Sequence, residues 1–400
     1  MTLVSAHLGF NKTYPLVSGG SLITGTDPNY YYRVFSGNGT LTVSGLPITM
    51  DIVLVGGGGG GGAVAYVNYG GGGGGGGGGV SEYMSQTVNP GTYPIVIGAG
   101  GTAGTSSVEP TRGIATSGLS YSVNGGGRGG SRTPSGFFNP ESGTSTGGSG
   151  GGGSTYMNTG LGGAAPTFGF GNAGGNAGSS LSGGGGGGGA GAAGSSASSG
   201  FGQGADGGAG RTSLYTTSDT SYFGTKRFAA PLGGGGGGGT SDSTSYGITT
   251  RARYTLSSLA VDTPSAGFAT CYTTNTPSVN ATAYIDVSVG DSTGFVGSVL
   301  SVNPGVSFVL STVGYPGLVS TSGPLTYTRS SASGSSDGVF GDGNGAYFTP
   351  YGTAGAGGNG FPSTGGGGGG GFSSNTSTFQ GGVGASGHLL LRYTKASVGG

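Results

Sequence analysis

Short apolar stretches alternate along this chain with long stretches of glycine. Residues 30–45, "YYYRVFSGNGTLTVSG", predict a β-hairpin, because two β-rich runs flank the turn-forming residues 36–39. Residues 48–55, "ITMDIVLV", predict a buried strand that leads directly into glycine, and 386–395 predict a final strand. No sustained helical periodicity is present, so the pattern predicts an all-β protein.

The glycine runs have nearly constant length. Pure runs cover 56–62, 70–79, 183–189, 233–239 and 365–371, and the near-run "GGSGGGG" covers 147–153. All are seven residues long except the second, which has ten. A flexible linker has no reason to keep one length, because the entropy of loop closure changes slowly with length. Constant length therefore suggests segments that cross a layer of fixed thickness.

A layer of this kind has a simple physical basis. A polyproline-II helix makes no internal hydrogen bonds, so its N–H and C=O groups point outward, and only glycine lets such helices approach closely. Seven residues in this geometry span roughly 22 Å. Bundled runs would satisfy one another's backbone groups, as buried groups require. The alternative is that the runs are disordered linkers between β-segments.

The full expectation is an all-β fold: a small β-sandwich platform from N- and C-terminal strands, packed polyglycine-II helices and an inserted β-module. Residues 52–55 and 389–392 are expected in one sheet or in facing sheets. The predicted division is an N-terminal attachment segment at 1–29, β-strands with the polyglycine-II region at 30–240, an inserted β-domain at 241–332, and a glycine-rich return with the C-terminal strand at 333–400. The glycine-poor span 241–332 has turn signals at the spacing of a small all-β module.

Composition narrows the functional classes. Glycine supplies 107 of the 400 residues, which is typical of low complexity, but 10% of residues are aromatic, which is unusual for a disordered chain. The formal net charge is zero, so nothing favours nucleic acid or a charged membrane surface. No apolar stretch reaches the ~18–20 residues of a membrane span. The first residues lack the features of a signal peptide, which predicts a chain made in the cytoplasm.

Catalytic and metal motifs are weak. Gly147-x-Ser149-x-Gly151 matches a nucleophile elbow but lies within low complexity. The two histidines, His7 and His388, lie at opposite ends of the chain, and Cys271 is the single cysteine. Asp342-Gly-Asn344 fits a plain turn better than a calcium loop. We therefore expect no enzyme activity, no cofactor and no metal.

Aromatic residues between the glycine runs are the candidate binding residues. They are Phe137, Phe138, Phe168, Phe170, Tyr222, Phe223, Tyr347, Phe348 and Tyr351. In one interpretation these rings cap the layer or fill a core. In the other they form apical loops that contact a receptor, since rigid aromatics provide contact area at low entropy cost. Arg128, Arg132, Lys226 and Arg227 add positive charge nearby, suited to phosphate or acidic sugar.

Several segments resemble a known family. "FSGNGTLTVSGLPITMDIVLVGGGGGGG", "NPGTYPIVIGAGGTAG" and "GHLLLRYTK" resemble the glycine-rich domain found in tailed-bacteriophage tail and fibre proteins. The matching positions are Pro90, Gly91, Tyr93, Gly98, Gly100, Gly101, Arg392 and Tyr393, while Ile95 and Ile97 replace expected valines. The layout also resembles the tip adhesins of T-even-type long tail fibres, in which polyglycine-II motifs carry variable loops that contact the host receptor. The resemblance covers 30–240 and 333–400; the module at 241–332 departs from it.

The resemblance implies a bacteriophage virion protein of the tail or tail fibre, assembled in the host cytoplasm, that binds a bacterial surface protein or glycan non-covalently. The alternative is a purely structural virion subunit of the tail or a capsid decoration. Other virion proteins and further copies of the chain are the expected partners, with no nucleic acid and no membrane insertion. A non-viral secreted coat or ice-binding protein is weakened by the missing signal peptide.

Overall fold

The structure is a computed structural model. It describes residues 14–23, 29–65, 70–134, 136–143, 147–155, 160–166, 170–178, 183–197, 204–211, 233, 235–236, 357, 359–360, 364–373 and 380–399, together with the backbone of six strands between 253 and 329. Strands dominate these residues, and their one helical element is a 3₁₀ turn, η1, at Ala396–Val398. The prediction of an all-β fold is confirmed.

Two antiparallel sheets form a sandwich. The larger sheet has the order β2 (Ser21–Ile23), β3 (Tyr30–Phe35), β20 (His388–Thr394), β5 (Ile48–Val55) and β7 (Val80–Val88). The smaller has the order β1 (Leu16–Ser18), β4 (Gly39–Ser44) and β8 (Gly91–Ile95). Side chains of both sheets share one core, which includes Leu41, Ile52, Ile95 and Leu391.

The C-terminal strand β20 lies in the middle of the larger sheet, between β3 and β5. Leu389 pairs with Leu54 and Leu391 with Ile52, so the prediction that these two segments share a sheet is confirmed. Both faces of β5 and β20 are buried, because Ile52 and Leu54 enter the shared core while Val53 and Val55 enter a second cluster on the opposite face.

The predicted hairpin at 30–45 is wrong. Strand β3 pairs with β2 and β20, whereas β4 pairs with β1 and β8, so residues 36–38 carry the chain from one sheet to the other. Burial explains the difference: β3 is buried on both faces at Tyr32 and Phe35, whereas β4 alternates between buried Leu41 and exposed Thr40. A strand buried on both faces belongs in a covered sheet, and a half-buried strand belongs in an outer one.

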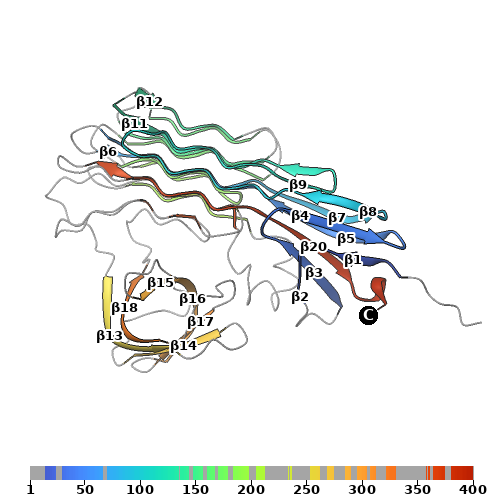
Figure 1. The fold of residues 1–400 in the computed structure, drawn as a ribbon. Coiled ribbons are helices and arrows are strands. Elements are labelled where there is room, and N and C mark those ends of the chain that lie inside the picture. Colours follow the sequence, from blue (N-terminus) through green and yellow to red (C-terminus); the bar gives the residue numbers. More distant parts are fainter. Residues whose placement is uncertain are drawn as a thin grey trace, which may run out of the picture.

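Beyond the sandwich, the chain crosses back and forth in extended segments (Figure 1). The short strands near the sandwich are β9 (Thr116–Gly118) and β10 (Tyr121–Val123), and those at the opposite end are β6 (Gly70–Gly71), β11 (Ser131–Thr133), β12 (Gly136–Phe138) and β19 (Phe372–Ser373). We call this opposite end the far end. The glycine segments thus extend from one end of the sandwich, as expected.

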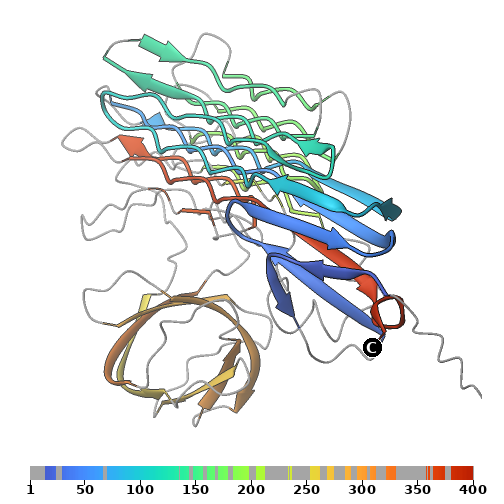
Figure 2. The ribbon, with the colours of Figure 1, turned by 45° about the vertical axis from the view of Figure 1, so that its right-hand side comes forward.

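The glycine-poor span forms a closed antiparallel barrel. Its strands follow the order β13 (Arg253–Val261), β14 (Phe268–Thr273), β17 (Ser307–Ser311), β16 (Phe295–Asn303), β15 (Tyr284–Val289) and β18 (Thr321–Arg329). Figure 2 shows the ring of strands most clearly. The four-part division of the chain stays a prediction; within its first part, residues 16–18 and 21–23 form β1 and β2 of the sandwich.

Candidate functional site: the glycine layer

Run 70–79 donates hydrogen bonds to its neighbours with a period of three residues. The N–H groups of Gly72, Gly75 and Gly78 bond to carbonyls of run 365–371, at 2.7–2.8 Å. Those of Gly73, Gly76 and Gly79 bond to segment 124–130, and those of Gly74 and Gly77 bond to run 183–189. Successive residues of run 70–79 therefore face three different neighbours in turn, and every third residue faces the same one.

The same run accepts hydrogen bonds from three further segments. Run 56–62 donates through Gly56, Gly59 and Gly62, segment 147–153 donates through Ser149 and Gly152, and Gly236 donates to Gly75. Three neighbours that accept and three that donate enclose run 70–79 on all sides. We call runs 56–62, 70–79, 147–153, 183–189 and 365–371, with the segments bonded to them, the glycine layer.

Close packing explains why the layer consists of glycine. A Cβ atom at Gly75 would lie 2.1 Å from the carbonyl oxygen of Gly59, and one at Gly59 would lie 2.1 Å from that of Gly127. Real Cβ atoms do not approach backbone oxygen this closely, so any side chain would push the segments apart and break their hydrogen bonds. The described parts of the runs are therefore packed against neighbours and are not free linkers.

The period of three matches the repeat of a polyproline-II helix. The hydrogen bonds of Gly72 to Gly79 all go to neighbouring segments, which fits this repeat, and the polyglycine-II geometry of the runs stays a prediction. Runs 56–62 and 70–79 lie antiparallel, because Gly56 bonds to Gly79 at the sandwich end and Gly62 bonds to Gly73 toward the far end.

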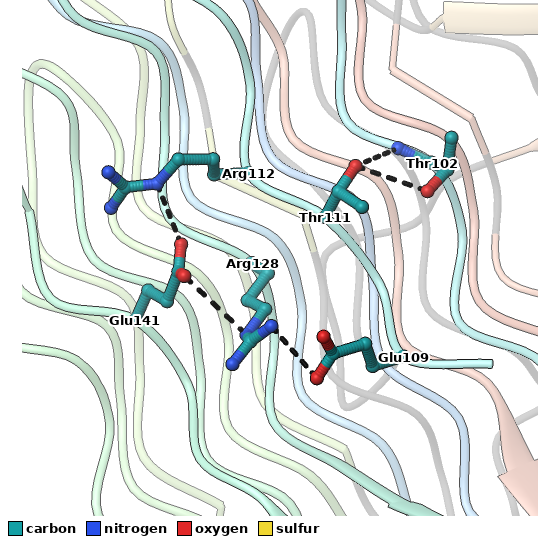
Figure 3. Close-up of polar contacts among 6 residues, drawn as sticks. All are labelled: Thr102, Glu109, Thr111, Arg112, Arg128 and Glu141. Carbon is teal, nitrogen blue, oxygen red and sulfur yellow. Dashed lines mark hydrogen bonds and ion pairs between the residues drawn. The ribbon is translucent and has the colours of Figure 1, made fainter.

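Four charged side chains cross one face of the layer, and we call Glu109, Arg112, Arg128 and Glu141 the charged strip (Figure 3). Arg112 Nε lies 2.8 Å from Glu141 Oε2, and Arg128 NH1 lies 3.0 Å from Glu109 Oε2. Arg128 Nε also lies 3.7 Å from Glu141 Oε1. The strip has alternating charges that sum to zero.

The charged strip connects separate segments of the layer. Arg112 follows Thr111, whose hydroxyl accepts a hydrogen bond from the N–H of Thr102 at 2.8 Å (Figure 3). The sequence indicated Arg128 as a source of positive charge suited to phosphate or acidic sugar, whereas the structure pairs it with two carboxylates. Lys226 and Arg227 lie outside the described residues.

Of the predicted aromatic residues, the structure describes Phe137 and Phe138 at one end of the layer and Phe170 at the other. Phe138 lies in β12 at the far end, where Phe137 pairs with Arg132 of β11. Phe170 lies at the other end of the layer, because it forms a β-bridge with Val80 at the start of β7. The remaining predicted residues, Phe168, Tyr222, Phe223, Tyr347, Phe348 and Tyr351, lie outside the described residues.

Phe170 has a local role that the sequence did not reveal. The guanidinium carbon of Arg211 lies 3.4 Å from the centroid of its ring, and Arg211 Nε lies 3.8 Å from Glu82 Oε1. The Glu82 side chain is only 4% exposed. No sequence signal links these three residues, because they are far apart in the chain and Glu82 belongs to β7 of the sandwich.

Arg33 of β3 joins the two sheets of the sandwich. Its Nε donates to the hydroxyl of Tyr393 at 3.0 Å, and its terminal nitrogens donate to the carbonyls of Val17 and Gly19. Burial raises the pKa of Tyr393, and the hydrogen bond from Arg33 opposes part of this increase. Arg33 therefore ties β20 to the segment that connects β1 with β2.

The described residues contain no group of three or more His, Cys, Asp or Glu side chains placed to hold a metal ion. His388 is fully buried in β20, where it pairs with Val55. In the part of the chain that the structure describes, no helix is long and apolar enough to cross a membrane.

These features define an all-β protein built around a hydrogen-bonded glycine layer. The chain belongs to the glycine-rich domain family, which matches residues 34–267, more than half of its length. The match includes the first four pure glycine runs, the near-run 147–153 and β13 of the barrel, whereas run 365–371 and β20 lie beyond it. A search among curated proteins finds no match.

Proposed function

We propose that this chain is a bacteriophage virion protein of the tail or tail fibre, and that it binds a bacterial surface receptor non-covalently. The observation that carries the proposal is the enclosure of run 70–79 by six hydrogen-bonded neighbours. A layer of this kind is rigid and nearly free of charge. It suits a protein that works outside the cell and holds its connecting loops in fixed positions.

Fixed loops favour binding because their conformational entropy is lost on folding and not on contact with the receptor. The hairpin β11–β12 is such a loop at the far end, with Phe138 at its end and the tip residue Pro134 exposed. Its aromatic and polar composition resembles that of binding loops elsewhere. Far-end loops are therefore our first choice for receptor contact.

The second candidate is a purely structural virion subunit, and the charged strip favours it. Arg128 is paired with Glu109 and Glu141 and Arg112 with Glu141, so the charged strip does not offer an unpaired cation to phosphate or acidic sugar. In that case the layer would serve as a rigid, neutral body. The barrel at 253–329 would be the competing candidate for contacts with other virion proteins.

An adsorption assay separates the two candidates. The purified protein, with a fluorophore at its C-terminus, is incubated with a panel of bacterial strains and washed. Saturable binding to some strains, reduced by envelope fractions of the same strains, is expected for an adhesin. Absence of saturable binding to every strain, for protein whose circular dichroism shows a folded state, would leave only the structural role.

A further inference from the structure

We propose that the gap between β3 and β5 is a strand-acceptor site, and that β20 from a second copy of this chain fills it when copies fold together. This inference does not depend on receptor binding. It rests on the order of the larger sheet, in which β3 and β5 are separated by the last strand of the chain.

The acceptor site offers hydrogen bonds on two sides. Six residues of β20, from Leu389 to Thr394, pair with β3, and five, from His388 to Arg392, pair with β5. Without β20, the facing edges of β3 and β5 would both be unpaired. Unpaired edges bind extended segments by β-augmentation, with main-chain hydrogen bonds that are the same for any copy of the chain.

The site also selects an apolar strand. Leu389 and Leu391 enter the core shared by the two sheets, while Leu390 enters the cluster on the opposite face. All three are at most 3% exposed. A segment that is apolar on both faces fits this position. A second copy of the chain has the same "HLLLRY" sequence and therefore the same apolar pattern.

The length of chain between the site and its strand favours exchange. Asp51 of β5 and its partner Arg392 of β20 are 341 positions apart, and the glycine layer lies between them. The site therefore stays open until the end of the chain arrives. Before the layer folds, the long connection also lowers the effective concentration of the chain's own strand. Exchange of an identical element between copies is a low-cost route to oligomers.

The test uses full-length chains with one cysteine each. One chain carries Tyr30→Cys and Cys271→Ser, and the other carries Thr394→Cys and Cys271→Ser. Tyr30 and Thr394 are directly paired across β3 and β20, so a short bismaleimide crosslinker can join them. The two chains are unfolded, mixed, refolded and then crosslinked. A crosslinked heterodimer is expected, because it forms when β20 of one copy lies beside β3 of the other.

Three controls fix the interpretation. A single chain with both new cysteines has to give an internal crosslink, which shows that the crosslinker spans the pair. A mixture in which Leu161→Cys replaces Thr394→Cys reports random collisions, because Leu161 is exposed and does not belong to the sandwich. Mixing chains that are already folded has to give only this collision level, since β20 is then enclosed on both sides.

A second readout needs no cysteine. Wild-type chains refolded at increasing protein concentration are expected to give an increasing fraction of dimer by light scattering, and the dimer is expected to persist on dilution. The proposal is overturned if the internal crosslink forms but the refolded mixture stays at the collision level. It is also overturned if wild-type chains refold only to monomers at every concentration.

Discussion

A guanidinium nitrogen of Arg392 lies 2.9 Å from Oδ2 of Asp51, directly across the pairing of β20 with β5. The other oxygen, Oδ1, accepts the N–H of Ser85, a β7 residue with a positive φ of 52°. The carboxylate therefore holds a point where the register of β5 and β7 shifts. The carboxylate of Asp51 thus joins three strands of the larger sheet, through the ion pair with β20 and the hydrogen bond from β7.

Truncation of Arg392 is expected to be costly. Its side chain and that of Asp51 are only 12% and 13% exposed, so Arg392→Ala leaves a nearly buried carboxylate without its charged partner. We expect a loss of about 3 kcal/mol in the free energy of unfolding. Urea denaturation measures it.

Arg112→Ala is the matched control, because the Arg112–Glu141 pair has a similar distance of 2.8 Å but side chains that are 43% and 30% exposed. Its cost should stay within about 1 kcal/mol. Equal losses for the two variants would contradict the role assigned to burial.

A methyl group in the glycine layer is expected to be destabilising. In Gly75→Ala the new Cβ would lie 2.1 Å from the Gly59 carbonyl oxygen, which belongs to backbone and cannot rotate away. We expect a loss of about 3 kcal/mol or more, from overpacking together with broken hydrogen bonds. Thermal melting followed by circular dichroism measures the change. Gly37→Ala is the control, because no atom lies within 4 Å of its added Cβ, and its melting curve should be nearly unchanged.

Amide hydrogen exchange tests the layer without mutation. The N–H groups of Gly72 to Gly79 are all bonded to neighbouring segments, so they should exchange slowly in the folded protein. The exposed turn at 36–38 is the internal reference for fast exchange. Equally fast exchange in both regions would show that the runs are linkers.

Stability should fall at high pH through Tyr393. Its pKa is raised in the folded state above the ordinary value of 10.0, chiefly by burial, so the folded state holds the phenol proton more tightly than the unfolded chain does. The stability that this tighter proton binding gives the folded state is therefore fully present below pH 10, and it is lost as the pH rises through the folded-state pKa.

Urea midpoints measured between pH 8 and pH 11 would check this prediction, with Tyr393→Phe as the comparison. Near neutral pH, the variant should have a free energy of unfolding about 1 kcal/mol below that of wild type, because Arg33 loses a hydrogen-bond acceptor. Between neutral and alkaline pH, the free energy of unfolding should fall less in the variant than in wild type. Parallel curves for the two proteins would remove Tyr393 as the cause.

Substitutions can show which end of the layer contacts the receptor. If the far end contacts the receptor, replacing Phe137 and Phe138 together by Ser should abolish adsorption to cells. Phe170→Ser should leave adsorption intact, because Phe170 lies beside Val80 at the sandwich end. Circular dichroism confirms that each variant is folded. Loss of adsorption with Phe170→Ser alone would place recognition at the sandwich end.

Local patterns predicted the strands but not all of their partners. Apolar stretches located β5 and β20, and the constant length of the glycine runs indicated that the runs cross together. The turn at 36–38 reads as a hairpin because a sheet-to-sheet connection uses the same residue types. The partners of β3 are β2 and β20, and β20 lies 360 positions away at the hydrogen-bonded residues Arg33 and Tyr393, a distance that nothing near β3 encodes.

The candidate site was predicted less well for a related reason. Arg128 stood out in the sequence, but its partners Glu109 and Glu141 become neighbours only through the alignment of separate crossings. That alignment depends on the three-residue period and on where each turn begins, and glycine-rich sequence carries no side-chain pattern from which to read it. Phe138 and Phe170 look equivalent in sequence for the same reason, although they lie at opposite ends.

The enclosure of run 70–79 also bears on the heat capacity of unfolding. Apolar surface exposed on unfolding raises the heat capacity, whereas exposed polar backbone lowers it. Unfolding of the glycine layer would expose mostly amide groups, because its interior is backbone and not apolar side chains. The layer should therefore contribute little to the heat capacity change, and its free energy of unfolding should fall almost linearly as temperature rises, because unfolding releases the conformational entropy of glycine. The sandwich core would weaken on cooling while the layer would not.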